Sequence, residues 1–408
     1  MDLQNLKDKF PFLISYMEGE NYSKYYIRSI EKDIGWIIKE ADAGHYKWEA
    51  YDDIYRTYID KWKNKTTLNH KRRRLSLIKR FDLESKMPNG SKQGHRPSSY
   101  DLLSAEFKRF IDTYRDVVGS KSSKRYHRGI GYMTCSFLLD LQNKGTDSFD
   151  SVTEKSVLEV FSSNGKICRS YDFKYAIEYA FKTCLPFYGN GVCSKIISYL
   201  PALPKVNKNV QYLTKMEIGR IKTVLEDDLS ISLQNKAICL LALYTGMRSC
   251  DICALTFDDI DWENDLIHIE QQKTGNPLVL PLRAVTGNAI FDYITKERPG
   301  SSANTIFLTV TAPYRRLHSS NLNAICVTVM NKAGVRNNPG DRKGIHLFRH
   351  YLATSLLGNG VAQPIISSTL GHRSPGSLAP YLSADFSHLK ECALSIDRFP
   401  VRKEVFRS

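Results

Sequence analysis

The stretch that decides the fold is residues 346–382, which read HLFRHYLATSLLGNGVAQPIISSTLGHRSPGSLAPYL. It opens on His346 and Arg349, which are three residues apart and therefore share one face of a helix. It closes on His372, followed nine residues later by Tyr381. A histidine beside an arginine offers hydrogen-bond donors for a phosphate and a group that moves protons near neutral pH. The stretch is therefore a candidate site for chemistry on a phosphate.

The same stretch has a second interpretation as a metal site. His346 and His350 stand four residues apart, a spacing at which two imidazoles on one helix face can bind a metal. The metalloprotease pattern places a glutamate directly after the first histidine, and Leu347 stands there instead. We therefore predict no metal at this site.

Two upstream segments add polar groups to the candidate site. In TGMRSCDICAL (residues 245–255), Arg248 follows a glycine turn at a predicted helix start, where its guanidinium fork matches two phosphate oxygens. Asp251 is three residues on and is expected to share its helix face. In QQKTGNPLVLPL (residues 271–282), Lys273 lies in a turn between two apolar strands, from which it can reach into a site. Each motif alone is more often a surface ion pair or a solvated turn lysine.

The overall charge points to a polyanionic partner. The chain carries 58 Lys plus Arg against 43 Asp plus Glu, a formal net charge of +15. Neutralising phosphates releases their counterions, so such an excess favours binding to nucleic acid. No apolar run is long enough to cross a bilayer, the first residues lack a signal-peptide core, and the nine cysteines show no disulfide framework. These features predict a soluble, cytoplasmic protein with no membrane partner.

The length of 408 residues favours two or three domains. Helical periodicity fills residues 1–83, a Pro- and Gly-rich stretch follows, and a second helical block contains five expected helices (101–118, 123–143, 152–162, 169–187 and 191–199). Thr214 and Glu217 form a capping box that opens the last domain. We predict an N-terminal helical domain, a second helical domain, a linker and a C-terminal domain, at residues 1–95, 96–200, 201–213 and 214–408.

The C-terminal domain is predicted to be mainly α with a small antiparallel β-sheet. Helices are expected over 214–225, 232–244 and 248–255, strands around Leu266–Ile269 and Leu278–Leu280, and a helical pattern from 286 onward. An amphipathic helix is expected to follow Tyr381, over residues 383–398.

A short pattern recurs at an interval of 100 residues. Ser23-Lys24-x-Tyr26-x-Arg28-x-Ile30 returns as Ser123-Lys124-x-Tyr126-x-Arg128-x-Ile130, each time before an apolar helix-like stretch. The first domain is therefore a candidate duplicated DNA-binding module, although so few matches are also within the reach of chance.

Basic residues outside the candidate site form the predicted DNA-binding set. They lie in the run at 70–74, in the repeated pattern and in the basic linker, and a solvated helix face is the alternative for each. The set is Lys71, Arg72, Arg73, Lys124, Arg128, Lys205 and Lys208.

The ordered set of an arginine, a lysine, a His-x-x-Arg pair, a histidine and a tyrosine resembles the tyrosine recombinase (phage integrase) family over residues 210–398. The resemblance implies the tyrosine recombinase catalytic fold, preceded by helical DNA-binding domains, with residues 96–200 similar to the family's core-binding (SAM-like) domain. Pro380 departs from the family pattern and leaves the resting geometry of Tyr381 open.

The resemblance also implies a role for each candidate residue. Tyr381 becomes the nucleophile that forms a 3′-phosphotyrosyl link, and His346 assists removal of its proton. Lys273 protonates the leaving oxygen, and Asp251 positions Arg248. Arg248, Arg349 and His372 stabilise the non-bridging phosphate oxygens. No metal, ATP or other cofactor is expected.

The implied function is site-specific DNA recombination, with the extra N-terminal block favouring the integrase or excisionase of a mobile element. The implied partners are double-stranded DNA with inverted-repeat core sites, a homotetrameric synapse built from dimers, and possible accessory DNA-bending proteins. The alternatives are a chromosome-dimer resolvase, a DNA invertase, a type IB topoisomerase and a catalytically silent DNA-binding regulator.

Overall fold

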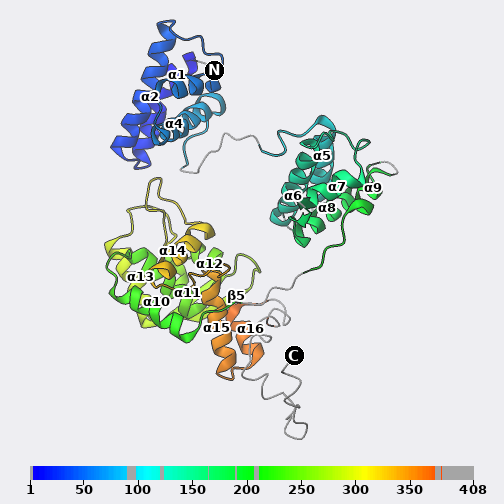
Figure 1. Ribbon diagram of the computed structural model, residues 1–408. Coiled ribbons are helices and arrows are strands. Elements are labelled where there is room, and N and C mark those ends of the chain that lie inside the picture. Colours follow the sequence, from blue (N-terminus) through cyan, green and yellow to red (C-terminus); the bar gives the residue numbers. More distant parts are fainter. Residues whose placement is uncertain are drawn as a thin grey trace. The chain divides into compact units, whose positions relative to one another are not determined.

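The computed structural model describes residues 3–89, 98–119, 124–163, 165–188, 191–205, 211–372 and 378 (Figure 1). Contacts within the chain divide it into two compact units, residues 1–92 with 209–408, and residues 93–208. The predicted helix over 383–398, Tyr381, Pro380 and Lys208 lie outside the described residues. Among the described residues, no helix is long and apolar enough to span a membrane.

The N-terminal residues form four helices, α1 (Leu3–Gly19), α2 (Lys24–Asp42), α3 (Tyr51–Lys61) and α4 (Lys65–Glu84). Their shared core contains Ile30, Ile34 and Tyr58, all fully buried. Ser23 begins α2 by accepting a hydrogen bond from the Tyr26 N–H, which satisfies one of the free donors at the helix start. The helical interpretation of residues 1–83 is confirmed.

Residues 93–208 contain five helices, α5 (Ala105–Val118), α6 (Lys124–Gln142), α7 (Glu154–Phe161), α8 (Tyr171–Cys184) and α9 (Val192–Tyr199). Phenylalanine rings dominate their core, with Phe110 stacked on Phe181 at 4.4 Å between ring centroids. All five helices correspond to the predicted ones. The sequence did not predict a short antiparallel pair of two-residue strands, β1 (Ser162–Ser163) and β2 (Lys166–Ile167). Strands this short have no periodicity to detect.

The C-terminal residues build a helical core around α11 (Leu233–Thr245), which is buried on almost every side. Around it lie α10 (Lys215–Asp227), α12 (Ser249–Ala254), α13 (Ala284–Lys296), α14 (Ser319–Lys332), α15 (His346–Gly358) and α16 (Gln363–Leu370). The capping box predicted for Thr214 and Glu217 is present. Helix α11 packs directly against α12, α13, α14 and α15, and α15 packs against α16 (Figure 1).

A three-stranded antiparallel sheet completes this part of the chain, in the order β3 (Ile260–Asp261), β4 (Leu266–Glu270) and β5 (Pro277–Pro281), after a short 3-10 turn at Phe257–Asp259. In β4, Ile267 and Ile269 face the core, and they pair with Leu280 and Leu278 of β5. The predicted strand pair and its connecting turn are confirmed.

The helical pattern predicted from 286 onward is wrong for residues 333–345, between α14 and α15, and for the longer segment 297–318. This segment is irregular, with isolated bridges from Thr256 to Thr305 and from Leu308 to Arg316. Arg298 organises it by donating hydrogen bonds to the carbonyls of Ala303, Thr305 and Ile306. The sequence Pro-Gly-Ser-Ser at 299–302 breaks the helical pattern, because proline and glycine disfavour helix continuation.

Candidate active site

Arg349 of α15 is the structural centre of the candidate site. The residue is only 8% exposed, and its guanidinium donates Nη1 to Gly246 O at 2.8 Å and Nη2 to Leu370 O at 2.7 Å. These carbonyls belong to the C-terminal ends of α11 and α16, whose last carbonyls lack partners within their own helices. One arginine therefore fixes the ends of two other helices relative to α15.

Arg248 lies at the N-cap of α12, directly after the left-handed turn at Gly246. Its Nη2 donates to Gly371 O at 3.1 Å, one residue beyond the carbonyl that Arg349 holds. Its Nη1 is buried and has no hydrogen-bond partner among the described residues. The two guanidiniums are thus anchored on consecutive carbonyls, and Arg248 retains donor capacity for an anion.

Gly371 is required at the end of α16 for two reasons. Its backbone is left-handed, with φ of +60°, a region that residues with a Cβ adopt at a cost. A Cβ built there would also lie 2.2 Å from Nε2 of Gln271. The amide of Gln271 therefore packs against the bare Cα, directly before His372.

Lys273 lies in the turn between β4 and β5 and is exposed. The preceding residue, Gln272, donates its backbone N–H to Asp251 Oδ1 at 2.9 Å. Asp251 is 2% exposed, and this bond joins the lysine turn to the helix that follows Arg248.

Asp251 therefore has a different contact from the one predicted. No ion pair joins it to Arg248 among the described residues, where the sequence suggested a shared helix face. The two side chains have different partners: the Arg248 guanidinium donates to Gly371 O, and the Asp251 carboxylate accepts the Gln272 N–H.

The histidines of the site have lowered pKa values. The pKa of His372 is lowered to about 4 by burial and by the charges of Arg349 and Arg248. The pKa of His346 is lowered by partial burial and by the charges of Arg349 and Lys273. The pKa of His350 is lowered to about 4 by burial and by its neighbours His346 and Arg349. Neutral imidazoles beside fixed cations are the expected state at neutral pH, so His346 is able to accept a proton.

The structure brings together five of the six residues predicted to be catalytic. Arg248, Arg349 and His372 meet at the ends of α11, α12 and α16, while Lys273 and Arg349 both act electrostatically on His346. Tyr381, the sixth, lies outside the described residues. Sequence reasoning gave no role to Gln271, and it considered His350 only as a metal ligand. The alternation of β4 continues one residue past the strand and places Gln271 on the same buried face as Ile267 and Ile269, which is the local signal that could have found it.

The predicted DNA-binding residues separate into two groups. Lys71 is paired with the buried Asp33, which also accepts a hydrogen bond from Arg74, and Lys71 lies 4.6 Å from the Trp62 ring centroid. Lys71 is therefore half-buried and ion-paired, unlike the exposed basic residues of the predicted set. The second group lies at the surface: Arg73, Arg128 and Lys205 are exposed, and Arg72 is half-buried. Lys124 begins α6, and its side chain, like Lys208, is not described.

Comparison with known proteins identifies this arrangement. Residues 211–388 match the sequence profile of the phage integrase family. The putative integrase/recombinase y4gC of Sinorhizobium fredii is 37% identical over 170 residues, which are 42% of this chain and 86% of that protein. The chain belongs to the phage integrase family. It is therefore placed among the tyrosine recombinases, the enzymes that its ordered motifs indicated.

Other phage integrase relatives match the same part of the chain. The putative integrase/recombinase y4rA of the same organism is 32% identical over 179 residues, 44% of this chain but only 42% of that protein. Tyrosine recombinase XerA of Pyrococcus furiosus is 26% identical, over 46% of this chain and 63% of XerA. The chain thus spans less than two thirds of these two relatives.

Solved structures support the fold. A lambda integrase dimer bound to a COC′ core site aligns with a TM-score of 0.52 and 17% identity, covering 74% of this chain and 83% of that one. XerH bound to difH substrate aligns with a TM-score of 0.51 and 16% identity, covering 74% and 97%. The mainly helical fold with a small antiparallel sheet, predicted from the sequence, is confirmed.

Proposed function

We propose that this chain is a site-specific DNA recombinase that cleaves and rejoins DNA through a 3′-phosphotyrosyl intermediate, as the integrase or excisionase of a mobile element. The observation that carries the proposal is the pair of guanidiniums of Arg248 and Arg349, anchored on the consecutive carbonyls of Gly371 and Leu370. Donors held rigidly by the fold need little reorganisation when charge develops on a phosphate, which is where they stabilise a transition state.

In the proposed cleavage step, Tyr381 Oη bonds to phosphorus while the bond from phosphorus to the 5′ oxygen breaks. The phenol has an ordinary pKa of about 10, so its proton must be removed, and neutral His346 accepts it. Lys273 delivers a proton to the departing 5′ oxygen. Arg248, Arg349 and His372 donate hydrogen bonds to the non-bridging oxygens. The link conserves the bond energy, so rejoining needs no ATP.

The role proposed for Asp251 follows its contact rather than its spacing. Its carboxylate accepts the Gln272 N–H and so restrains the turn that carries Lys273. We propose that Asp251 positions the lysine turn relative to the helix that begins at Arg248.

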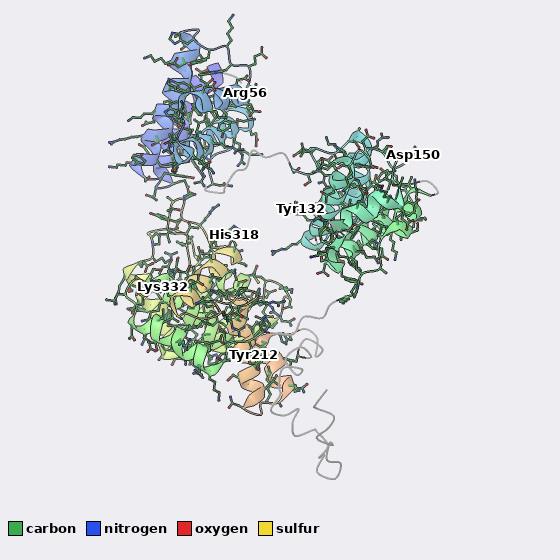
Figure 2. All side chains as sticks on the ribbon, viewed as in Figure 1. Arg56, Tyr132, Asp150, Tyr212, His318 and Lys332 are labelled. Atoms are coloured by element: carbon green, nitrogen blue, oxygen red, sulfur yellow. The ribbon has the colours of Figure 1, made fainter. Side chains whose placement is uncertain are left out.

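We further propose that the helical modules at residues 1–95 and 96–200 are related and that both contact DNA. Helices α2 and α6 are each 19 residues long and begin at equivalent positions of the repeated pattern. Four of the five buried positions of α2 have a buried counterpart 100 residues later in α6, with Ile30 and Ile130 as one pair, whereas the position of the buried Asp33 does not. Arg28 and Arg128 are both exposed at the corresponding place. Tyr132, labelled in Figure 2, adds an aromatic ring to the surface of α6 with 69% exposure.

The partners follow from the same proposal. XerH was solved on its difH substrate and the lambda integrase dimer on a core site. We carry over to this chain a duplex with inverted-repeat core sites and a synapse of four protomers, to which accessory DNA-bending proteins would add. Chromosome-dimer resolution and DNA inversion use the same chemistry and remain the alternative roles.

The experiment compares the wild-type chain with Tyr381→Phe on a pool of random-sequence DNA duplexes. The wild type is expected to capture a subset of duplexes as a protein–DNA adduct that survives denaturation. Tyr381→Phe is expected to retain DNA binding and to form no adduct. DNA binding without adduct by the wild type would support the silent regulator and overturn the proposal.

A further inference from the structure

We infer that Gln271 is a positioning residue for the proton donor, Lys273. Through its hydrogen bond to the carbonyl of Leu370, it holds the turn of Lys273 in place relative to His372. The inference rests on the proposed function, because it needs Lys273 to act as an acid. Gln271 is 1% exposed and directly follows β4. A buried amide carries a desolvation cost unless its donors and acceptors are satisfied, so its partners are informative.

The side chain of Gln271 connects the lysine turn to α16. Its Oε1 accepts a hydrogen bond from Thr274 Oγ1 at 2.6 Å, within the turn. Its Nε2 donates to Leu370 O at 3.3 Å, at the end of α16. Lys273 lies between the two hydrogen-bonded residues of the turn, and His372 lies two residues beyond the accepting carbonyl.

The backbone of Gln271 closes the same turn. Its N–H donates to Asn276 O at 3.0 Å, and its carbonyl accepts from the Gly275 N–H at 2.8 Å. Gly275 has a φ of +67°, the left-handed conformation that glycine adopts at little cost. The turn around Lys273 is therefore fixed internally, and it moves as one piece with the Gln271 side chain.

Leu370 O is shared by two donors that the mechanism needs together. It accepts Nη2 of Arg349 at 2.7 Å as well as Nε2 of Gln271. Hydrogen bonds to this one oxygen atom therefore hold both the Arg349 guanidinium, which stabilises the phosphate, and the turn of Lys273, which supplies the proton. Gly371 permits this arrangement, because any Cβ there would collide with the Gln271 amide.

Gln272 provides a second restraint of a different kind. Its N–H is held by Asp251, on the side of the turn that faces α12. The Gln271 contact fixes the turn against α16, and the Asp251 contact fixes it against α12. Loss of the first restraint alone is expected to misplace the ammonium while the arginine anchors on Gly246 and Gly371 stay intact.

The test compares two leaving groups on a duplex captured by the wild-type chain from a random-sequence pool. One substrate is unmodified, and the other has sulfur in place of the bridging 5′ oxygen at the scissile phosphate. A thiol has a pKa of about 8.5, against about 15.7 for water, so the thiolate leaves without a proton from the enzyme. A defect confined to the proton donor therefore disappears on the sulfur substrate, whereas a general structural defect remains on both.

The main variant is Gln271→Met, which keeps the length of the side chain and removes both hydrogen bonds. Adduct formation on the oxygen substrate is expected to slow by about 10²-fold, the loss typical of a small misplacement of a reacting group. On the sulfur substrate its rate is expected to match the wild-type rate. Thr274→Val, which removes only one of the two bonds, is expected to show a smaller defect with the same rescue and serves if Gln271→Met does not fold. Val279→Thr, exposed on the same hairpin, is the control expected to behave as wild type.

Equal slowing of Gln271→Met on both substrates, or wild-type rates on the oxygen substrate, would overturn the inference. Lys273→Ala separates this result from the proposed function. If Lys273→Ala is rescued by sulfur and Gln271→Met is not, only the positioning role fails. If Lys273→Ala is not rescued, the acid assignment fails and the role of Gln271 fails with it.

Discussion

Arg349 Nη1 donates to Gly246 O at 2.8 Å, so a side chain of α15 holds the last turn of α11 directly before Arg248. The same guanidinium holds Leu370 O, directly before Gly371 and His372. One buried group therefore sets the spacing between the other donors of the site. Its role is geometric as well as electrostatic, which makes it sensitive to a substitution that keeps the charge.

Arg349→Lys is expected to lose both stability and cleavage, because a lysine ammonium cannot span two carbonyls with the fork of a guanidinium. Leaving a buried carbonyl without a donor costs about 1–3 kcal/mol of unfolding free energy. Adduct formation is expected to fall by about 10²-fold or more, the loss typical of removing one preorganised donor. The measurements are thermal melting and the rate of adduct formation. Arg220→Lys, exposed on α10, is the matched control, and equal behaviour of the two variants would contradict the anchoring role.

Gly371→Ala tests the close approach of the lysine turn to α16. The left-handed backbone alone costs about 1–2 kcal/mol for an alanine, and overpacking against Gln271 adds about 1–3 kcal/mol. Gly360→Ala separates the two effects, because Gly360 has a φ of +75° with nothing within 4 Å of a built Cβ. Melting temperatures should therefore fall further for Gly371→Ala than for Gly360→Ala. Equal shifts would show that the packing against Gln271 carries no energy.

Acid is expected to destabilise α15 and the end of α16. The pKa of His350 and of His372 is about 4 in the folded chain, against 6.5 as the ordinary value. Because these pKa values are depressed, the unfolded chain binds more protons than the folded chain between pH 6.5 and 4. The stabilisation is complete above pH 6.5 and is lost as the pH falls towards 4. At pH 5 the loss amounts to about 1–2 kcal/mol of unfolding free energy per histidine.

Hydrogen exchange of peptides from α15 at pH 7.5 and pH 5, corrected for intrinsic rates, measures this effect. His350→Gln is expected to reduce the loss of protection, and His268→Gln, exposed on β4, to leave it unchanged. Undiminished protection of the wild type at pH 5 would show that the histidines do not titrate in this way.

Arg73 and Lys71 are expected to behave differently although both lie in one basic run. Arg73 is exposed, so Arg73→Ala should lower the slope of log affinity against log salt for duplex DNA by about 0.9 for each phosphate that the variant no longer neutralises. Lys71 is paired with Asp33, so Lys71→Ala should leave the slope unchanged and destabilise helices α1–α4. Salt titrations of DNA binding and tryptophan fluorescence during urea unfolding give the two readouts. A reduced slope for Lys71→Ala would show that Lys71 contacts DNA despite its ion pair.

The sequence predicts most of the helices because their starts carry local signals. The capping box at Thr214 and Glu217 and the apolar spacing of Ile218, Ile221 and Leu225 locate α10 without any tertiary information. The β4–β5 hairpin is equally visible, since Ile267 and Ile269 alternate with polar residues on one face.

Long-range contacts explain what the sequence could not show. Lys71 looks like a surface lysine until Asp33, 38 residues away, is found buried beside it. Asp251 has the spacing of an ion pair with Arg248, and only the folded hairpin reveals its bond to Gln272. Gln271 and Leu370 are 99 residues apart, so their hydrogen bond has no local signature.

The most direct test of the central claim is to identify the residue that becomes linked to DNA. The denaturation-resistant adduct of the full chain is digested with nuclease and protease, and the peptide carrying a residual nucleotide is sequenced by mass spectrometry. We expect a single peptide spanning Tyr381, with the nucleotide joined to the phenol oxygen through its 3′-phosphate. A nucleotide on any other residue, or a link through a 5′-phosphate, would contradict the proposed mechanism.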